Sequence, residues 1–431
     1  MNISLYTLTS PLHDQKAVDA ASAEFLAEIE SKLGFSFDFR GHDFSGYGTG
    51  NLDVIYVRTG GTEGIFEEVF PALGGNILLL TSGKSNSLAA SMEILSYLNQ
   101  KGRQGEIIHG STDYISERLK VLAQVQAARK SLNGKKLGVI GQPSDWLISS
   151  NPDAEALKAK LGVNLVHVPI EELIDIMLSD EDLSAYSHRS MGQNSGLGNP
   201  DMTEITAQIP STIQKYTSGA LRIYSSLKKL IEKYELSGLT LRCFDLLTAV
   251  ENTGCLALAL LNAEGYPAGC EGDVPTLLTM TVGQALTGQC GFQCNPSRIN
   301  PETGELLLAH CTIPFDMIRN YSFNTHFESG IGIAIHGEMP EGPATIFKLS
   351  GDLSRQFCCK AKLMGNPYEK SLCRTQITMK LDNNAAMTDG AGLLTPTTIC
   401  RDYFLKSPIG NHHVVFNGDH SALFEAFCKA L

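Results

Sequence analysis

Strand-like and helix-like stretches alternate along the first third of the chain, and this alternation constrains the fold more than any other feature of the sequence. The expected strands cover residues 3–8, 53–57, 76–81 and 106–108, and the expected helices cover residues 17–33, 64–70, 88–98 and 112–132. Such a rhythm predicts a parallel sheet with crossover helices on its faces. Because the last of these helices ends near Asn133-Gly134, we place the end of a first domain at residue 134.

The same alternation starts again after that boundary. Residues 136–141 form an expected strand that ends in glycine, and a helix at 154–161 and a strand at 164–168 follow. This order predicts a second doubly wound domain, residues 135–238. Short strands separated by Gly and Pro turns then predict a β-rich, barrel-like domain, residues 239–431. The expected fold class is therefore α/β, with two doubly wound, Rossmann-like parallel-sheet domains followed by a β-rich, barrel-like C-terminal domain.

The charge balance limits the classes of partner. The chain has 34 basic and 46 acidic residues, a formal net charge of -12 and no basic run, which argues against binding to nucleic acid or to an anionic membrane surface. The first residues lack a basic and apolar leader, and no apolar run approaches the length of a membrane span, so we expect a cytoplasmic protein. A small neutral molecule is the expected substrate.

The eleven cysteines are scattered along the chain rather than spaced as a disulfide framework, and we expect most of them to be buried thiols. Cys290 and Cys294 stand four residues apart, but no second pair has the spacing of a structural zinc site. The sequence therefore does not predict structural zinc.

Three short motifs in the expected C-terminal domain carry carboxylates and imidazoles. They are Cys270-Glu271-Gly272-Asp273, Leu308-Ala309-His310-Cys311 and Asn411-His412-His413. Asp273 stands just before Val274-Pro275 at the start of an apolar helical stretch, so capping of that helix is one role for it. Glu271 has no such structural role, which makes its carboxylate a candidate for chemistry.

Side-chain alternation limits how the histidines can be used. His310 lies in an expected strand, where it faces either a site or the core. If residues 412–416 form a strand, His412 and His413 point in opposite directions, so at most one of them can be a ligand from that strand. A glutamate and one or two histidines from distant segments form an oxygen-and-nitrogen site, which suits Mn²⁺ or Mg²⁺ better than structural zinc.

The segment Arg58-Thr59-Gly60-Gly61-Thr62 follows a strand at the expected carboxyl edge of the first sheet, where such folds bind ligands. Arg58 and Thr62 are therefore candidate substrate contacts. A glycine turn that leads into a helix explains the same segment equally well.

The three motifs, in this order, resemble those of the L-fucose and L-arabinose isomerase superfamily, mainly over residues 240–431. The resemblance implies that Glu271 and His413 bind a catalytic metal, Mn²⁺ or another divalent cation such as Mg²⁺. It also implies that His310 is a third ligand, as in the arabinose isomerases. Asn295 stands where the family has a further acidic ligand. An amide oxygen can bind a hard cation but cannot accept a proton as an aspartate does, so this departure affects acid–base chemistry more than metal binding.

The resemblance further implies a metal-dependent aldose–ketose isomerase that acts on a pentose, a hexose, a deoxyhexose or a derivative through a cis-enediol. In that reaction Glu271 is ligand and proton carrier, Asn295 is a ligand in the catalytic centre, and Asp273 or Glu251 is the second proton carrier. His310 and His412 are then contacts to substrate hydroxyls.

Family members assemble as symmetric homo-oligomers, often hexamers, so the resemblance implies a homo-oligomer in which Arg58 or Thr62 reaches the sugar of an adjoining subunit. Two alternatives stay open. A metal-dependent epimerase or a sugar lyase could use the same scaffold, because an enediolate can be reprotonated or cleaved in several ways. A non-catalytic sugar-binding protein is the other alternative, and Asn295 is the residue in its favour.

Overall fold

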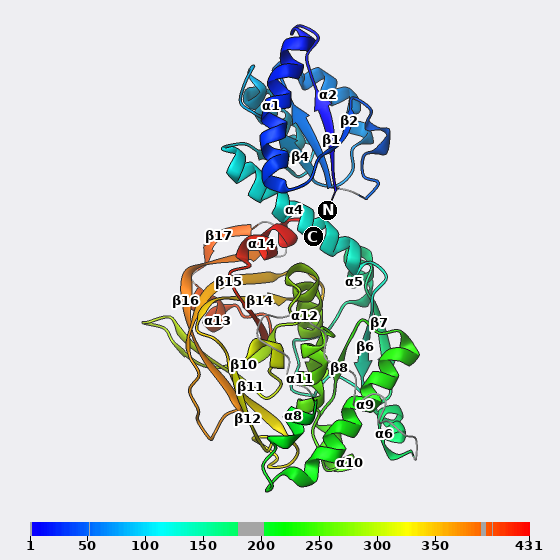
Figure 1. The fold of residues 1–431 in the computed structure, drawn as a ribbon, viewed down its shortest axis with the longest axis vertical. Helices are drawn as coiled ribbons and strands as arrows, with labels where there is room; N and C mark the ends of the chain where they lie inside the picture. The colour runs from blue at the N-terminus through cyan, green and yellow to red at the C-terminus, as the bar shows by residue number, and fades with distance from the viewer. Residues whose placement is uncertain (1, 51, 180–201, 389–393, 399) are drawn as a thin grey trace. The chain divides into compact units, whose positions relative to one another are not determined.

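The computed structural model describes residues 2–50, 52–179, 202–388, 394–398 and 400–431 (Figure 1). Apart from the last two residues, the chain divides into two compact units, Met1–Lys130 and Ser131–Lys429. The division into three domains at residues 134 and 238 stays a prediction. No helix in the described ranges is long and apolar enough to cross a membrane.

The N-terminal unit is built on a five-stranded parallel sheet with the order β2-β1-β3-β4-β5. Its strands are β1 (Ile3–Leu8), β2 (Asp38–Gly41), β3 (Leu52–Val57), β4 (Ile77–Leu80) and β5 (Gly105–Ile108). Its helices are α1 (Gln15–Leu33), α2 (Glu63–Val69), α3 (Ser87–Gln100) and α4 (Thr112–Leu132), the last of which crosses the boundary between the units. The central strands β3 and β4 are buried and almost wholly apolar, with Asp53 the one charged residue, because helices cover both faces of such a sheet. The predicted parallel sheet is confirmed.

Local signals explain where these elements begin and end. The Asp14 carboxylate accepts hydrogen bonds from the backbone N–H groups of Lys16 and Ala17 and so caps the first turn of α1. Gly34 ends the same helix in the left-handed conformation, with φ of 80°. β2 was not expected from the sequence, because this short edge strand is polar and at least half-exposed and so lacks an apolar pattern.

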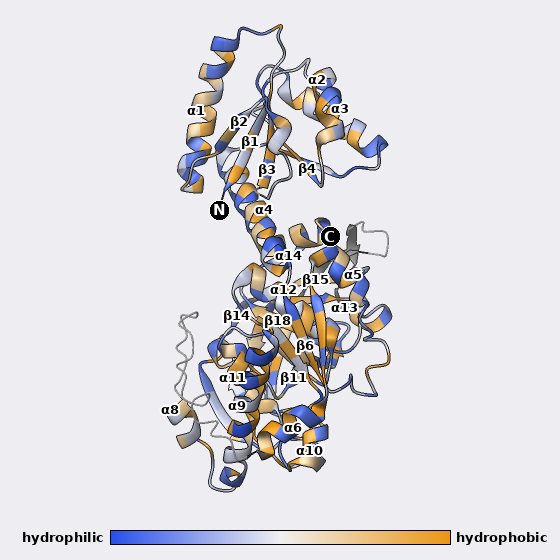
Figure 2. Ribbon diagram, turned by 90° about the vertical axis from the view of Figure 1, so that its right-hand side faces the viewer, coloured by the Kyte–Doolittle hydropathy of each residue, from blue (hydrophilic) through white to orange (hydrophobic). Residues whose placement is uncertain are grey.

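The second unit begins with a four-stranded parallel sheet with the order β7-β6-β8-β9. Its strands are β6 (Lys136–Ile140), β7 (Asn164–Val168), β8 (Gly238–Leu241) and β9 (Ala268–Cys270). Its helices are α5 (Ala154–Leu161), α6 (Ile170–Leu178), α8 (Met202–Ala207), α9 (Thr217–Tyr234), α10 (Asp245–Ala249), α11 (Cys255–Ala263) and α12 (Val274–Thr287). In Figure 2, β6 is mostly apolar, whereas the surface helices alternate between polar and apolar residues.

A closed six-stranded antiparallel barrel completes this unit. Its strand order is β11-β10-β18-β14-β15-β16, and pairing of β11 with β16 closes the ring. The strands are β10 (Phe292–Asn300), β11 (Glu305–His310), β14 (Gly342–Leu349), β15 (Gln356–Gly365), β16 (Thr375–Thr388) and β18 (His413–Asn417). The predicted barrel-like region is confirmed, and α12 packs against β14 and β18 on its outside (Figure 1).

Further elements attach to this frame. β17 (Leu394–Thr398) pairs with β16. β12 (Asn320–Asn324) and β13 (Ala334–Glu338) form a separate hairpin. Two helices, α13 (Cys400–Lys406) and α14 (Ser421–Lys429), flank β18 in the sequence. Nine cysteines of the described chain are free thiols, and eight of these are buried, as the sequence predicted for most of them.

Candidate metal centre and active site

Glu271 occupies a strained turn directly after β9. Its φ of 66° lies in the left-handed region, which costs a residue with a side chain about 1–2 kcal/mol. The next residue, Gly272, also has a positive φ, and a Cβ at this position would lie 2.5 Å from the carbonyl oxygen of Gln142. A glycine is therefore required beside Glu271. Backbone strain that close packing maintains is concentrated at functional sites, so the Glu271 side chain is a candidate functional group.

Three buried side chains meet at this turn. The Glu271 Oε1 atom lies 3.3 Å from His412 Nε2 and 3.6 Å from His310 Nε2, and the candidate ligand atoms of all three residues lie within 4.8 Å of one another. His310 ends β11, and His412 immediately precedes β18. Both strands pair with β10, so the barrel register brings the two imidazoles together over the carboxylate.

A second set of residues orients His412. Its Nδ1 atom lies 2.8 Å from Asp273 Oδ2, while Asp273 Oδ1 accepts a hydrogen bond from the backbone N–H of Thr276 and caps α12. The Nζ atom of buried Lys348 lies 3.9 Å from Asp273 Oδ2. Burial alone would raise the pKa of Asp273, but the Lys348 charge and the bond to His412 outweigh burial and lower this pKa. Ionised Asp273 thus holds the proton of His412 on Nδ1 and turns Nε2 toward Glu271.

The charges in the cluster depend on one another. Burial opposes ionisation of Glu271, but the two neighbouring imidazoles outweigh it and hold the pKa of the carboxyl well below its usual range. Burial likewise opposes protonation of His412, yet the carboxylates of Glu271 and Asp273 raise the pKa of this imidazole to about 9. His310 Nδ1 lies 2.9 Å from the hydroxyl of Thr312, which fixes the direction of its Nε2 atom.

The cluster fits a divalent cation. The Nε2 atom of His412 is buried beside Glu271 and has no hydrogen-bond partner among the described residues, so a cation that displaces its proton would find this nitrogen available as a ligand. Ligands about 2.1 Å from a metal lie roughly 3.0–3.4 Å apart, close to the observed separations of 3.3 and 3.6 Å. Two imidazole nitrogens and one carboxylate oxygen suit Mn²⁺ or a later transition metal better than Mg²⁺, which prefers oxygen ligands.

Trp146 forms a wall of the cluster that the sequence analysis missed. Its indole N–H donates a 2.6 Å hydrogen bond to Glu271 Oε2. Its ring packs edge-on against that of Phe244, with 4.9 Å between the ring centroids. The Trp146 side chain is half-exposed and also contacts the buried Glu271 carboxylate, so it lies between that carboxylate and solvent. Trp146 is the single tryptophan of the chain, and its place in the loop after the first strand of a doubly wound sheet is the signal that could have identified it.

Lys348 was also missed. It is 1% exposed, and besides its contact with Asp273 its ammonium group donates a 2.7 Å hydrogen bond to the Thr276 hydroxyl. Burial lowers the pKa of this lysine. A lone lysine within the otherwise apolar end of β14 was the available signal.

His413, which the resemblance implies as a ligand, lies outside the group of Glu271, His310 and His412. His413 Nε2 lies 2.8 Å from the Tyr403 hydroxyl and its Nδ1 lies 3.0 Å from the Asn411 carbonyl oxygen, so both ring nitrogens are already engaged. Burial lowers the pKa of His413 to about 3. The two adjacent histidines contact different residues, and His412 is the one that joins Glu271 and His310.

Asn295 and Asp273 lie close to His412, and Asp273 also caps α12, which is one of the two roles predicted for it. Asn295 lies on β10 opposite Ala309, and its Oδ1 accepts a 3.3 Å hydrogen bond from Asn411, the residue before His412. Asp273 contacts His412 and the start of α12, which is the geometry of a positioning residue rather than of a group that meets substrate. Glu251, the other candidate proton carrier, is exposed and has a φ of 48°.

Arg58 and Thr62 lie in the N-terminal unit and are engaged locally. The buried Arg58 guanidinium pairs with Asp19 and donates a 3.2 Å hydrogen bond to Ser22. The Thr62 hydroxyl donates to the Thr59 carbonyl oxygen at 3.1 Å. These contacts explain both residues as parts of the turn between β3 and α2.

Comparison with known proteins gives relatives but no family model that matches the chain. The chain is 24% identical over 330 residues to the sulfoquinovose isomerases of Priestia aryabhattai and Priestia megaterium, a match that covers 74% of this chain and 69% of each relative. It is 23% identical over 219 residues to the sulfoquinovose isomerase of a Clostridium species, covering 50% of this chain and 45% of the relative.

Proposed function

We propose that this chain is a metal-dependent aldose–ketose isomerase of sugars, in which Glu271, His310 and His412 hold Mn²⁺. The observation that carries the proposal is the buried cluster with its unpartnered His412 Nε2 atom. The names of the three relatives support a sugar isomerase independently of the geometry. The expected homo-oligomer and the cytoplasmic location stay predictions.

A divalent cation bound here would stabilise negative charge on two adjacent sugar oxygens, which lowers the barrier to removing a proton from the neighbouring carbon. The chain's own residues prepare that site. Trp146 holds one oxygen of Glu271, and Asp273 sets the tautomer of His412. Because the amide of Asn295 cannot accept a proton, Glu271 is the carboxylate in the cluster that can carry the proton between C1 and C2.

The substrate class is a pentose, a hexose, a deoxyhexose or a derivative, and the sugar named in the relatives, sulfoquinovose, is the first derivative to test. An epimerase would return a second aldose, and a lyase would return two smaller fragments. Product identification by NMR separates these reactions from the formation of a ketose.

The decisive experiment compares metal-stripped protein with and without added Mn²⁺ or Mg²⁺ on this panel of sugars, in the wild type, Glu271→Gln and a matched control. The control is Glu302→Gln, an exposed residue in the turn between β10 and β11. We expect Mn²⁺-dependent ketose formation that falls more than about 10³-fold in Glu271→Gln and is unchanged in the control.

Equal conversion with and without metal, or a fully active Glu271→Gln protein, would contradict the proposal. Tight Mn²⁺ binding without conversion of any sugar would favour the sugar-binding alternative, to which Asn295 already points.

A further inference from the structure

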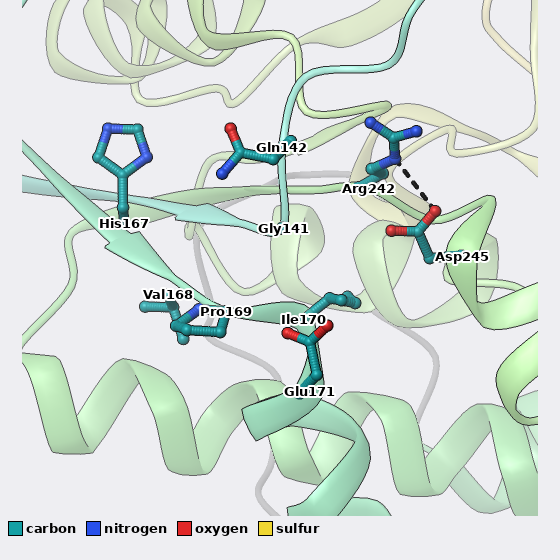
Figure 3. Close-up of a pocket in the computed structure, with 9 residues that line it drawn as sticks. All are labelled: Gly141, Gln142, His167, Val168, Pro169, Ile170, Glu171, Arg242 and Asp245. Atoms are coloured by element: carbon teal, nitrogen blue, oxygen red, sulfur yellow. Dashed lines mark hydrogen bonds and ion pairs between the residues drawn. The ribbon is translucent and has the colours of Figure 1, made fainter.

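A separate cavity of about 390 Å³ opens at the carboxyl edge of the second parallel sheet (Figure 3). From β6 the chain adds β7 on one side of the sheet and then β8 and β9 on the other, so the crossover connections change direction between β6 and β8. Ligands of doubly wound folds bind outside the carboxyl ends of the strands at such a point. The cavity is lined by Gly141, Gln142, His167, Val168, Pro169, Ile170, Glu171, Arg242 and Asp245. None of these residues belongs to the Glu271 cluster.

A glycine with a positive φ, Gly141, forms the floor of the cavity. Gly141 has a φ of 81°, and a Cβ at this position would lie 3.0 Å from the Cβ of Arg242 and 3.5 Å from that of Ile170. A larger residue would therefore fill the floor, where the segments that follow β6, β7 and β8 converge. The loop after β6 lies between the cavity and the cluster, because Gln142 lines the cavity while Trp146 contacts Glu271.

The charges around the cavity disfavour an anion. The Arg242 guanidinium is already engaged, with Nε bonded to Asp245 at 3.0 Å, Nη1 bonded to the Pro143 carbonyl at 2.9 Å, and Asp145 at 3.3 Å from Nη2. Asp145, Asp245 and Glu171 thus place three carboxylates against one guanidinium. A sulfonate or phosphate would meet net negative charge here.

The remaining polar groups suit hydroxyls. Among the described residues, no side-chain hydrogen bond occupies Gln142, His167 or Glu171, and Figure 3 shows Gln142 and Glu171 turned toward the space between the loops. Together an amide, an imidazole and a carboxylate supply both donors and acceptors, as a run of hydroxyls requires. The apolar wall of Val168, Pro169 and Ile170 matches the C–H face of a sugar ring.

We propose that this cavity binds a neutral, hydroxyl-rich small molecule, an unmodified sugar or alditol, at a site separate from the Glu271 cluster, and that it discriminates against sulfonated and phosphorylated sugars. This inference goes beyond the isomerase activity and does not depend on it.

The test uses metal-stripped, full-length Glu271→Gln protein, in which the cluster cannot turn over substrate. Binding of glucose, sorbitol and glucose 6-phosphate is followed by ligand-observed NMR titration. We expect saturable binding of the two neutral compounds and at least about tenfold weaker binding of the phosphate. Glu171→Ala combined with His167→Ala should weaken the neutral ligands about tenfold, since each lost hydrogen bond contributes roughly 0.5–1.5 kcal/mol.

The matched control is Glu155→Ala, because Glu155 is also an exposed glutamate in the first turn of a helix, α5, but does not line the cavity. Both cavity residues are exposed, so equal urea midpoints will show that the variants fold normally. Absence of saturable binding, equal binding in the cavity variant and the control, or preference for the phosphate would overturn the proposal. Because the cluster carries the same Glu271→Gln change in every protein compared, a difference in binding between the cavity variant and the control reports on the cavity, whatever the cluster does.

Discussion

The carboxyl edges of the two parallel sheets both carry strained residues, but they differ in the side chains that meet there. The edge of the N-terminal sheet also has strained residues, Ser85 and Asn86, and a buried hydroxyl, that of Thr9, without a partner among the described residues. Its buried charge, Arg58, is neutralised by Asp19. At the edge of the second sheet, Glu271 is strained, and it meets the imidazole of His310, at the end of β11, and that of His412, just before β18. Strain and isolated polar atoms thus occur at both edges, whereas the group of possible metal ligands found among the described residues lies at the second edge alone.

Replacement of His412 is the strongest way to test this difference. His412→Gln removes the nitrogen that faces Glu271, so we expect Mn²⁺ affinity to fall more than about 100-fold and turnover more than about 10³-fold. Isothermal titration with Mn²⁺ measures the first effect directly. His413→Gln is the control, because it should lower the unfolding midpoint through lost bonds to Tyr403 and Asn411 while the folded protein keeps its metal affinity. The reverse pattern would return the ligand role to His413.

Asp316 is a buried carboxyl that lies outside the Glu271 cluster, so it shows what burial alone does to an acidic side chain. Burial raises the pKa of this carboxyl to about 7, and its Oδ1 atom has no partner among the described residues. The folded state thus binds the proton more tightly than the unfolded state, so the stability contributed by this group is full below about pH 4 and is lost as pH rises through about 7.

We expect Asp316→Asn to leave stability nearly unchanged at pH 4 and to raise it by up to about 4 kcal/mol at pH 8. Urea unfolding at both pH values measures the difference. The same change at both values would show that the carboxyl has a partner that keeps its pKa ordinary.

Arg58→Met addresses the first edge. We expect the free energy of unfolding of the N-terminal unit to fall by about 1–2 kcal/mol, because bonds to Asp19 and Ser22 are lost while the methionine retains much of the packing. Thermal unfolding and the kcat/KM for the identified sugar should be measured on the same preparation. A loss of kcat/KM at unchanged stability would instead give Arg58 the substrate contact that the sequence suggested.

Thr9→Val has the smallest expected effect. Removal of an unpartnered buried hydroxyl with nearly unchanged shape should be neutral or stabilise the protein by less than about 1 kcal/mol. A destabilisation of more than that in urea unfolding would reveal a ligand or partner of the hydroxyl, and the two edges would then be more alike than their contents indicate.

The sequence predicted the sheets and the barrel because periodicity and turn residues report local structure. It also singled out Glu271 and His310, which the structure brings together. The choice between His412 and His413 needed the barrel, since alternation shows that the two side chains oppose each other but not which side meets Glu271.

Other parts of the site were beyond local reasoning. Trp146 stands 125 residues from the carboxylate it contacts. Lys348 lies in an apolar strand, and its partner Asp273 is explained in the sequence by helix capping alone. Contacts of this kind depend on tertiary packing, which no pattern within a single segment encodes.

The position of β18 has a consequence for the order of events during synthesis. β18 is the last strand along the described chain, yet it lies between β10 and β14 in the barrel. Ribosomes release a chain from its N-terminus, so β10 and β14 must wait for a neighbour that emerges only after β15, β16 and β17 have been made. His412 arrives with that strand. A nascent chain that still lacks β18 therefore cannot assemble the cluster, and metal loading must follow the synthesis of this strand.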